Sequence, residues 1–162
     1  GINTKIVRRS NALFNYKYGK TFLYSEALLV GDGILGKIIG YLSLIPIFMV
    51  IQKKGSIIKR IVDLFVPKAG QGPSKKQREN GFFNLRFYFD NGQQKYLAKV
   101  TGDMDPGYGS TSKMLAECAV CLALDDTLNK NYGVITPSFA FEKNILERLQ
   151  NNAGLKFSMK KI

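Results

Sequence analysis

A turn rich in glycine and acidic residues runs directly into a compact apolar segment at residues 102–124. The hydroxyl of Ser110, Thr111 or Ser112 can accept a hydrogen bond from the first free backbone amides of a helix that starts here. Residues 114–124 leave such a helix almost no polar face, so it has to be covered nearly all round. The sequence therefore predicts that this helix is the central helix of the core.

Polar side chains gather in the turn and in the first part of the predicted helix: Asp103, Asp105, Tyr108 and Lys113. Free N–H groups at a helix N-terminus favour anions, and many ligand sites lie at such ends. These side chains can orient a substrate, with Arg8 or Arg9 joining Lys113 to hold an anionic group. A capped turn with a solvated surface explains the same pattern, and both interpretations stay open.

The charge and the residue types limit the possible chemistry. The 162 residues include 24 Lys and Arg against 12 Asp and Glu, a formal net charge of +12 that favours anionic partners. The absence of histidine excludes histidine acid–base catalysis, and with only two cysteines it also excludes most zinc sites. Cys118 and Cys121 spell CxxC, but inside an apolar helix rather than at its start, so packing explains them better than redox chemistry. The sequence identifies no catalytic residue and no metal site.

Residues 31–36 spell GxGxxG after a strand-like run at 21–30. A dinucleotide fold needs a second buried strand that ends in an acidic residue about 20 positions later, and no such strand follows. A flexible connection to the next helix is therefore favoured over a phosphate-binding loop.

Residues 38–51 form an uncharged stretch of fourteen residues that contains Pro46. The stretch is shorter than the roughly 20 residues needed to cross a bilayer. A helix buried against the sheet and a helix lying in a membrane interface both remain open. The second alternative would use apolar residues and a basic flank: Ile38, Tyr41, Leu44, Phe48, Lys53 and Lys54.

The remaining pattern predicts an α+β fold, with an antiparallel or mixed sheet and helices packed mainly on one face. The clearest signal is a hairpin of strands 82–89 and 94–101 around an Asn-Gly turn, with Leu85, Phe87 and Phe89 on its buried face. Other expected elements are a strand or helix end at 2–14, a helix at 57–66, a helical turn from Ser74, an amphipathic helix at 139–150 with Phe141, Ile145, Leu146 and Leu149 inward, and a last strand at 155–159.

Several segments together resemble the C-terminal half of the saccharopine dehydrogenase-like oxidoreductases, a family that includes the trans-acting enoyl reductases. The resemblance rests on segments in the same order along nearly the whole chain: Val7-Arg8-Arg9-Ser10, Gly70-Gln71-Gly72-Pro73-Ser74, Gln77-Arg78-Glu79, Gly81-Phe82, Gly102-Asp103, Pro106-Gly107-Tyr108, Lys113-Met114, Gly133-Val134, Thr136-Pro137 and Leu149 with Gly154-Leu155.

The resemblance implies an N-terminal Rossmann domain that binds NAD(P), followed by an α+β substrate and dimerisation domain. The Rossmann half is absent from residues 1–162, so we expect a single C-terminal domain of a longer chain, inactive alone and without bound cofactor. The start at Gly1 rather than Met also indicates a fragment. Some family members are associated with lipid bodies or membranes, which implies an intracellular protein, peripheral to such surfaces in some cases.

Two functional hypotheses follow: the substrate domain of an oxidoreductase, and a non-catalytic module that binds a lipid or membrane surface through residues 38–51. The apolar surface exceeds what one thin sheet can cover, which predicts a homodimer through residues 38–66 or the hairpin at 82–101. Nucleic acid is not the expected partner, because the cluster at residues 75–78 lacks interleaved aromatic side chains.

Overall fold

The computed structural model describes residues 3–51, 70, 72–125 and 132–162. The chain divides into two compact units: one comprises Gly1–Thr4 and Leu23–Gly72, and the other comprises Lys5–Phe22 and Pro73–Ile162. The helix expected at 57–66 lies outside the described residues. The prediction that the chain is one domain of a longer protein stays a prediction.

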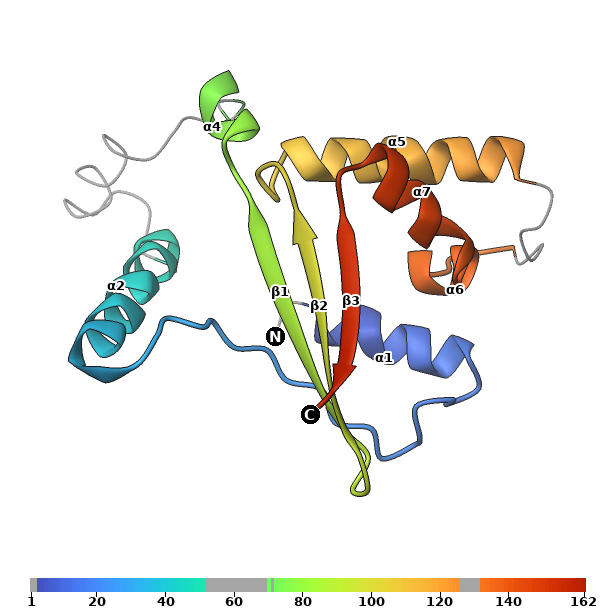
Figure 1. Ribbon diagram of the computed structural model, residues 1–162, viewed down its shortest axis with the longest axis horizontal. Coiled ribbons are helices and arrows are strands. Elements are labelled where there is room, and N and C mark those ends of the chain that lie inside the picture. Colours follow the sequence, from blue (N-terminus) through green and yellow to red (C-terminus); the bar gives the residue numbers. More distant parts are fainter. Residues whose placement is uncertain (1–2, 52–69, 71, 126–131) are drawn as a thin grey trace. The chain divides into compact units, whose positions relative to one another are not determined.

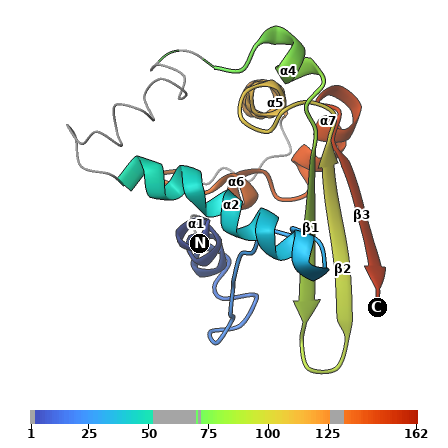
Figure 2. The same cartoon turned by 90° about the vertical axis from the view of Figure 1, so that its left-hand side faces the viewer.

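The second unit carries the sheet and most of the helices. In chain order the elements are α1 (Thr4–Leu13), α2 (Gly33–Ile51, in the first unit), α4 (Lys75–Glu79), β1 (Phe83–Asp90), β2 (Lys95–Gly102), α5 (Gly109–Leu124), α6 (Pro137–Phe141), α7 (Asn144–Asn152) and β3 (Lys156–Lys161). The sheet is antiparallel with strand order β1-β2-β3 (Figure 1). Helices α1, α5 and α6 lie on one side of it (Figure 2). The predicted α+β fold with helices on one face is confirmed.

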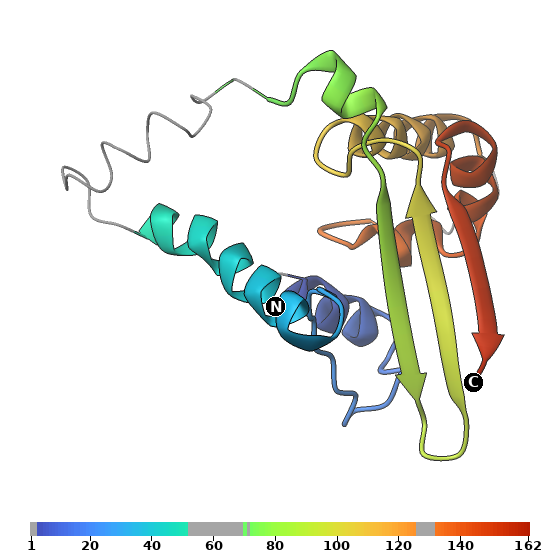
Figure 3. The same cartoon turned by 60° about the vertical axis from the view of Figure 1, so that its left-hand side comes forward.

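The hairpin forms where the sequence places it, with both strands shifted by one residue towards the C-terminus. In the connecting loop, the Asn91 side-chain oxygen accepts hydrogen bonds from the backbone amides of Gln93 (3.0 Å) and Gln94 (2.7 Å). Gly92 has a φ of 83°, a conformation that glycine adopts without strain. The loop lies at one end of the sheet, and α5 and α7 lie at the other (Figure 3).

The core lies between α5, α7 and the near end of the sheet. Its buried residues are Cys121, Phe141, Ile145, Leu149, Ala153 and Leu155, and Phe83, Val100 and Phe157 from the three strands pack against them. Towards the hairpin loop the same face loses its cover, and Leu85, Phe89 and Met159 are exposed. The expected burial of the apolar hairpin face therefore holds only at the end near α5.

Two expectations for the first unit are wrong. The run at 21–30, most of which lies in this unit, forms no strand, although its composition favours one. The described part of this unit offers no other strand, so its backbone groups have no ladder to join. The glycine stretch at 31–36 is not a flexible connection throughout, because α2 already begins at Gly33. A Cβ on Gly36 would lie 2.2 Å from the Gly31 carbonyl oxygen, so this close turn requires glycine.

The expected burial of the helix after the turn is also wrong. Helix α5 packs on α7 and the sheet with one side only, and Leu115 and Leu122 on its outer side are 69% and 64% exposed. It also starts earlier than the hydroxyl residues suggest. Its N-cap residue is Tyr108, which makes no side-chain capping bond.

The helix expected at 139–150 is split into α6 and α7. The break lies at Glu142, which has a φ of 48°, and α7 then restarts in a new direction. Phe141, Ile145 and Leu149 point inward as predicted, whereas Leu146 is exposed.

The first segment is a helix rather than a strand, and it is tied to α6 by side chains. The hydroxyls of Ser10 and Thr136 lie 2.8 Å apart, and the rings of Phe14 and Phe139 meet edge to face at 5.1 Å. The helical turn expected from Ser74 is confirmed as α4, with a capping box between Ser74 and Gln77.

Candidate functional site

The carboxylate of Asp105 organises the turn between β2 and α5. It accepts hydrogen bonds from the backbone amides of Tyr108 (2.8 Å) and Gly109 (2.9 Å), where α5 begins. Its own amide donates to the Arg78 carbonyl at 3.0 Å. The backbone hydrogen bonds, that of Tyr108 first, lower the pKa of Asp105. Asp105 therefore stays ionised and caps α5 from the preceding turn.

Asp103 of the same turn forms an ion pair with Lys113 of α5, with 2.7 Å between Oδ1 and Nζ. The Asp103 carboxylate lies against Gly154, in the turn between α7 and β3. Gly154 has a φ of 71°, and a Cβ there would come within 2.2 Å of Asp103 Oδ2. This close approach and the positive φ require glycine at position 154. An anionic ligand at Lys113 would have to compete with Asp103.

The structure brings Asp103, Asp105, Tyr108 and Lys113 together, and Tyr108 is exposed beside the start of α5. The two arginines of α1 are not joined to this group by any hydrogen bond or ion pair in the described part of the chain. Arg9 instead donates from Nη2 to the Val134 carbonyl at 3.1 Å, and Arg8 is exposed. A substrate role for all of them stays a prediction.

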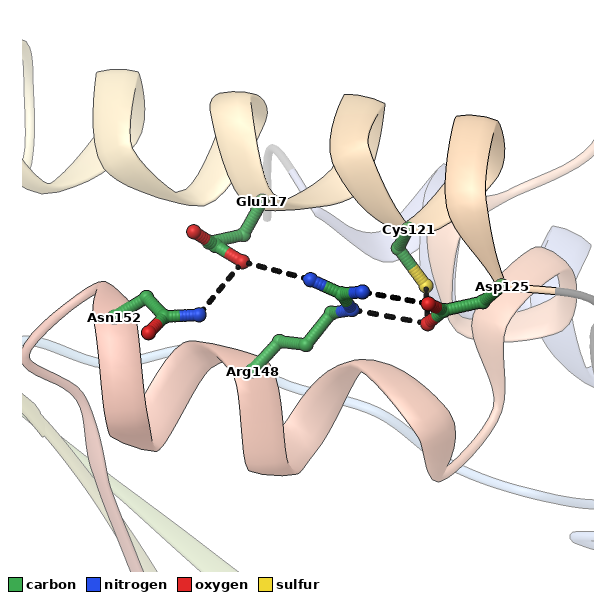
Figure 4. A network of polar contacts seen from close by, with 5 residues as sticks. All are labelled: Glu117, Cys121, Asp125, Arg148 and Asn152. Carbon is green, nitrogen blue, oxygen red and sulfur yellow. Dashed lines mark hydrogen bonds and ion pairs between the residues drawn. The ribbon is translucent and has the colours of Figure 1, made fainter.

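A second polar group, which the sequence analysis missed, joins α5 to α7. Arg148 reaches from α7 to two carboxylates of α5 and its C-terminal end (Figure 4). It donates to both oxygens of Asp125, at 2.9 Å from Nε and 2.5 Å from Nη2, and its Nη1 lies 3.4 Å from Glu117 Oε2. Asn152 donates to the same Glu117 oxygen at 3.1 Å. We call these residues, with Cys121, the Arg148 network.

Hydrogen bonds set the protonation states in this network. Those from Arg148 lower the pKa of Asp125 to about 2, and they raise the pKa of Arg148 itself. Burial, helped by its bond to Asp125, raises the pKa of the Cys121 thiol to about 11. Burial also raises the pKa of Cys118. Both thiols are therefore protonated at neutral pH, which agrees with the packing interpretation of the CxxC pair.

The spacing of these residues in the sequence could have indicated the Arg148 network. Glu117, Cys121 and Asp125 follow one another at intervals of four residues, so they line one face of a helix. Arg148 and Asn152 have the same spacing on the partner helix. Complementary charges on two such faces predict a contact, although the choice of partner helix depends on the fold.

The described residues contain neither a candidate metal cluster nor a strand in front of the glycine motif at 31–36. Among them, no group of three or more His, Cys, Asp and Glu side chains could hold a metal ion. The glycine motif at 31–36 lacks the preceding strand that a dinucleotide fold requires.

The residues named for the membrane alternative lie in or beyond α2. Ile38, Tyr41 and Leu44 are exposed on this helix. Phe48 belongs to α2, but its side chain lies outside the described set, as do Lys53 and Lys54. None of the described helices is long and apolar enough to cross a membrane.

The chain is similar to mycobacterial proteins named for enoyl reduction. It is 39% identical, over 91% of its length, to a protein of Mycobacterium tuberculosis (strain ATCC 25618 / H37Rv) provisionally named a trans-acting enoyl reductase. It is 36% and 35% identical, over the same share of its length, to the trans-acting enoyl reductases of Mycobacterium ulcerans and Mycobacterium leprae. The chain spans 36% of the length of each of these curated relatives.

No protein-family model matches the chain. No solved structure is significantly similar to it.

Proposed function

We propose that the chain is the C-terminal substrate and dimerisation portion of an NAD(P)-dependent, saccharopine dehydrogenase-like oxidoreductase that acts as a trans-acting enoyl reductase. The observation that carries the proposal is the 39% identity over 91% of the chain to a protein of that name. The ordered motifs from Val7 to Leu155 support it, because they extend through both turns of the candidate site.

In this proposal the chain positions the substrate and another part of the longer protein supplies the hydride carrier. Enoyl reduction adds a hydride and a proton across a carbon–carbon double bond conjugated to a carbonyl. The described residues have no strand in front of the glycine motif at 31–36, and both of their thiols are protonated at neutral pH. Their contribution is therefore binding: Tyr108 offers an exposed ring and hydroxyl, while Lys113, held by Asp103, offers a positioned charge.

The source gene tests the proposal directly. Upstream of the codon for Gly1 we expect an open reading frame that encodes a strand, a GxGxxG turn and a helix. The longer protein should then oxidise NADPH when an enoyl thioester is added, and the chain alone should not. An upstream region without such a unit, or a longer protein that leaves NADPH unchanged with every enoyl thioester tried, would contradict the proposal.

The same proposal includes a homodimer. The exposed apolar side chains of α2 and of the hairpin, such as Ile38, Leu85 and Phe89, need cover, and a two-fold pairing supplies it without an open edge. Light scattering at micromolar concentration should give twice the monomer mass of 18.1 kDa. A single monomeric species would contradict the dimer.

A second candidate is a lipid- or membrane-surface-binding module. Helix α2 favours this candidate, because it carries almost no charge and exposes the apolar side chains of Ile38, Tyr41 and Leu44. The chain should then float with anionic vesicles at low salt, and Leu44→Asp should reduce flotation more than the control Leu122→Asp on α5. Failure of the wild-type chain to float would exclude this candidate.

A further inference from the structure

The two faces of the sheet differ sharply in chemistry. Phe83, Val100 and Phe157 share the face that packs against α5 and α7. Side chains alternate along a strand, so the neighbouring positions point to the opposite face. That face presents Arg86 from β1, Lys99 from β2, and Lys156 and Lys160 from β3, all of them exposed. We call these four residues the basic sheet face.

The strand register concentrates these charges around Lys99. Arg86 lies directly opposite Lys99 on β1, and Ser158 lies directly opposite it on β3. Lys156 and Lys160 flank Ser158 on the same face, so each is diagonal to Lys99 at a distance of about 7–8 Å. Such separations are within the Debye length of about 8 Å at physiological ionic strength, so the charges repel one another and act together on a partner.

Nothing in the described sheet neutralises this group. Asp90 is the one carboxylate on the same face of the strands, at the hairpin end, and it is engaged by Lys95 at 3.3 Å. None of the four cations of the basic sheet face forms an ion pair within the described residues. Like charges directly opposite each other destabilise a sheet, so the pairing of Arg86 with Lys99 has a stability cost that an anionic partner would offset.

We propose that the basic sheet face is a docking surface for an acidic surface of a partner protein. The inference rests on the proposed function, because an enzyme that acts in trans has to recognise another macromolecule. Charge complementarity selects the kind of partner. The cations stand on three hydrogen-bonded strands, so little ordering is needed when carboxylates meet them.

Two other anionic partners fit this face less well. Proteins that bind single-stranded nucleic acid stack successive bases on several aromatic side chains. Across the described strands this face presents one aromatic residue, Tyr88. An interfacial membrane site needs apolar side chains that insert beside the cations. Leu97 is the aliphatic side chain here, and it is half-buried between the strands.

The test measures binding of the whole chain to fluorescently labelled poly-glutamate by anisotropy, at low and at physiological ionic strength. Arg86→Glu with Lys99→Glu removes the centre of the basic sheet face. The matched control is Lys17→Glu with Lys20→Glu, in the exposed loop after α1, which lowers the net charge of +12 by the same amount. We expect the sheet variant to bind at least about tenfold more weakly than the control. Equal losses in the two variants would overturn the proposal.

A second double substitution with a smaller charge change tests the proposal even if the sheet variant misfolds. Lys99→Gln with Lys160→Gln removes charge without placing carboxylates side by side, and Lys17→Gln with Lys20→Gln is its control. We expect several-fold weaker binding in the sheet pair alone, with unchanged circular dichroism. Unchanged binding in a folded sheet pair would contradict the proposal.

Two further probes separate the possible partners. A DNA duplex and phosphatidylserine vesicles are titrated under the same conditions. If one of these probes binds the wild-type chain more tightly than poly-glutamate does and loses this binding in the sheet variant, the proposal of an acidic protein is overturned. That result would identify nucleic acid or an anionic membrane as the partner. None of these measurements uses NADPH, so weak poly-glutamate binding beside an active longer reductase would reject the docking surface and leave the proposed function standing.

Discussion

Helices α5 and α7 pack against each other, yet they use their apolar residues differently. Helix α7 is charged and polar overall, and two of its three apolar residues, Ile145 and Leu149, are buried in the core, while Leu146 is exposed. Helix α5 is mostly apolar, and Cys121 is its one buried apolar side chain, while Leu115 and Leu122 stay exposed. A narrow apolar stripe is satisfied by one neighbouring layer, whereas a helix that is apolar all round needs more cover than these neighbours supply.

The two helices therefore differ in what their leucines contribute to stability. Leu149→Ala removes buried methyl groups and should lower the free energy of unfolding by about 2–5 kcal/mol. Leu122→Ala should change it by less than about 0.5 kcal/mol, because this side chain is 64% exposed. Urea unfolding followed by circular dichroism measures both. Similar losses would show that α5 is covered in solution, through association for example.

Breaking the link between the helices should have the next largest effect. Arg148→Met keeps the aliphatic stem but leaves Asp125 and Glu117 without their shared donor. We expect a lower urea midpoint than in the wild-type chain, with a smaller shift than Leu149→Ala produces. Lys143→Met, an exposed change just before α7, is the control. A midpoint equal to that of the control would mean that the network adds no stability.

The same network predicts a loss of stability in acid. The pKa of Asp125 is lowered from 3.8 to about 2 by its bonds to Arg148. A carboxyl group whose pKa is lowered in the folded state stabilises the protein fully when the pH is above its unfolded-state pKa. This stabilisation is lost as the pH falls through the folded-state pKa. The urea midpoint should therefore drop between pH 3.8 and about 2, and Asp125→Asn should flatten this drop. An unchanged slope in Asp125→Asn would contradict the assignment.

The smallest expected effect concerns the two thiols of α5. Cys121 is fully buried with a pKa raised to about 11, whereas Cys118 is partly exposed. In the native chain a disulfide reagent at pH 8 should label Cys118 faster than Cys121, since thiolate and access both limit the rate. The variants Cys118→Ser and Cys121→Ser assign each phase. Equal rates would indicate that the contact between α5 and α7 opens readily.

Local chemistry determined several elements from the sequence alone. The Asn91-Gly92 pair and the aromatic and apolar residues on either side specify the hairpin, since the turn residues set the register. Ser74 and Gln77 specify α4 through a capping box. The spacing of Phe141, Ile145 and Leu149 specifies which side faces the core. In each case the signal and the structure lie within a few residues of each other.

The tertiary structure decided what depends on distant partners. Residues 21–30 have the composition of a strand but form none, because a strand forms only where another strand offers its backbone groups. Asp105, rather than a hydroxyl of Ser110 to Ser112, caps α5, because the preceding turn folds back onto the helix start. Arg148 reaches Asp125 because α7 packs beside α5, and no signal within a few residues of Arg148 specifies that contact. The apolar composition of α5 predicted how much of its surface should be buried. Only the packing showed that α7 and the sheet bury one side of it.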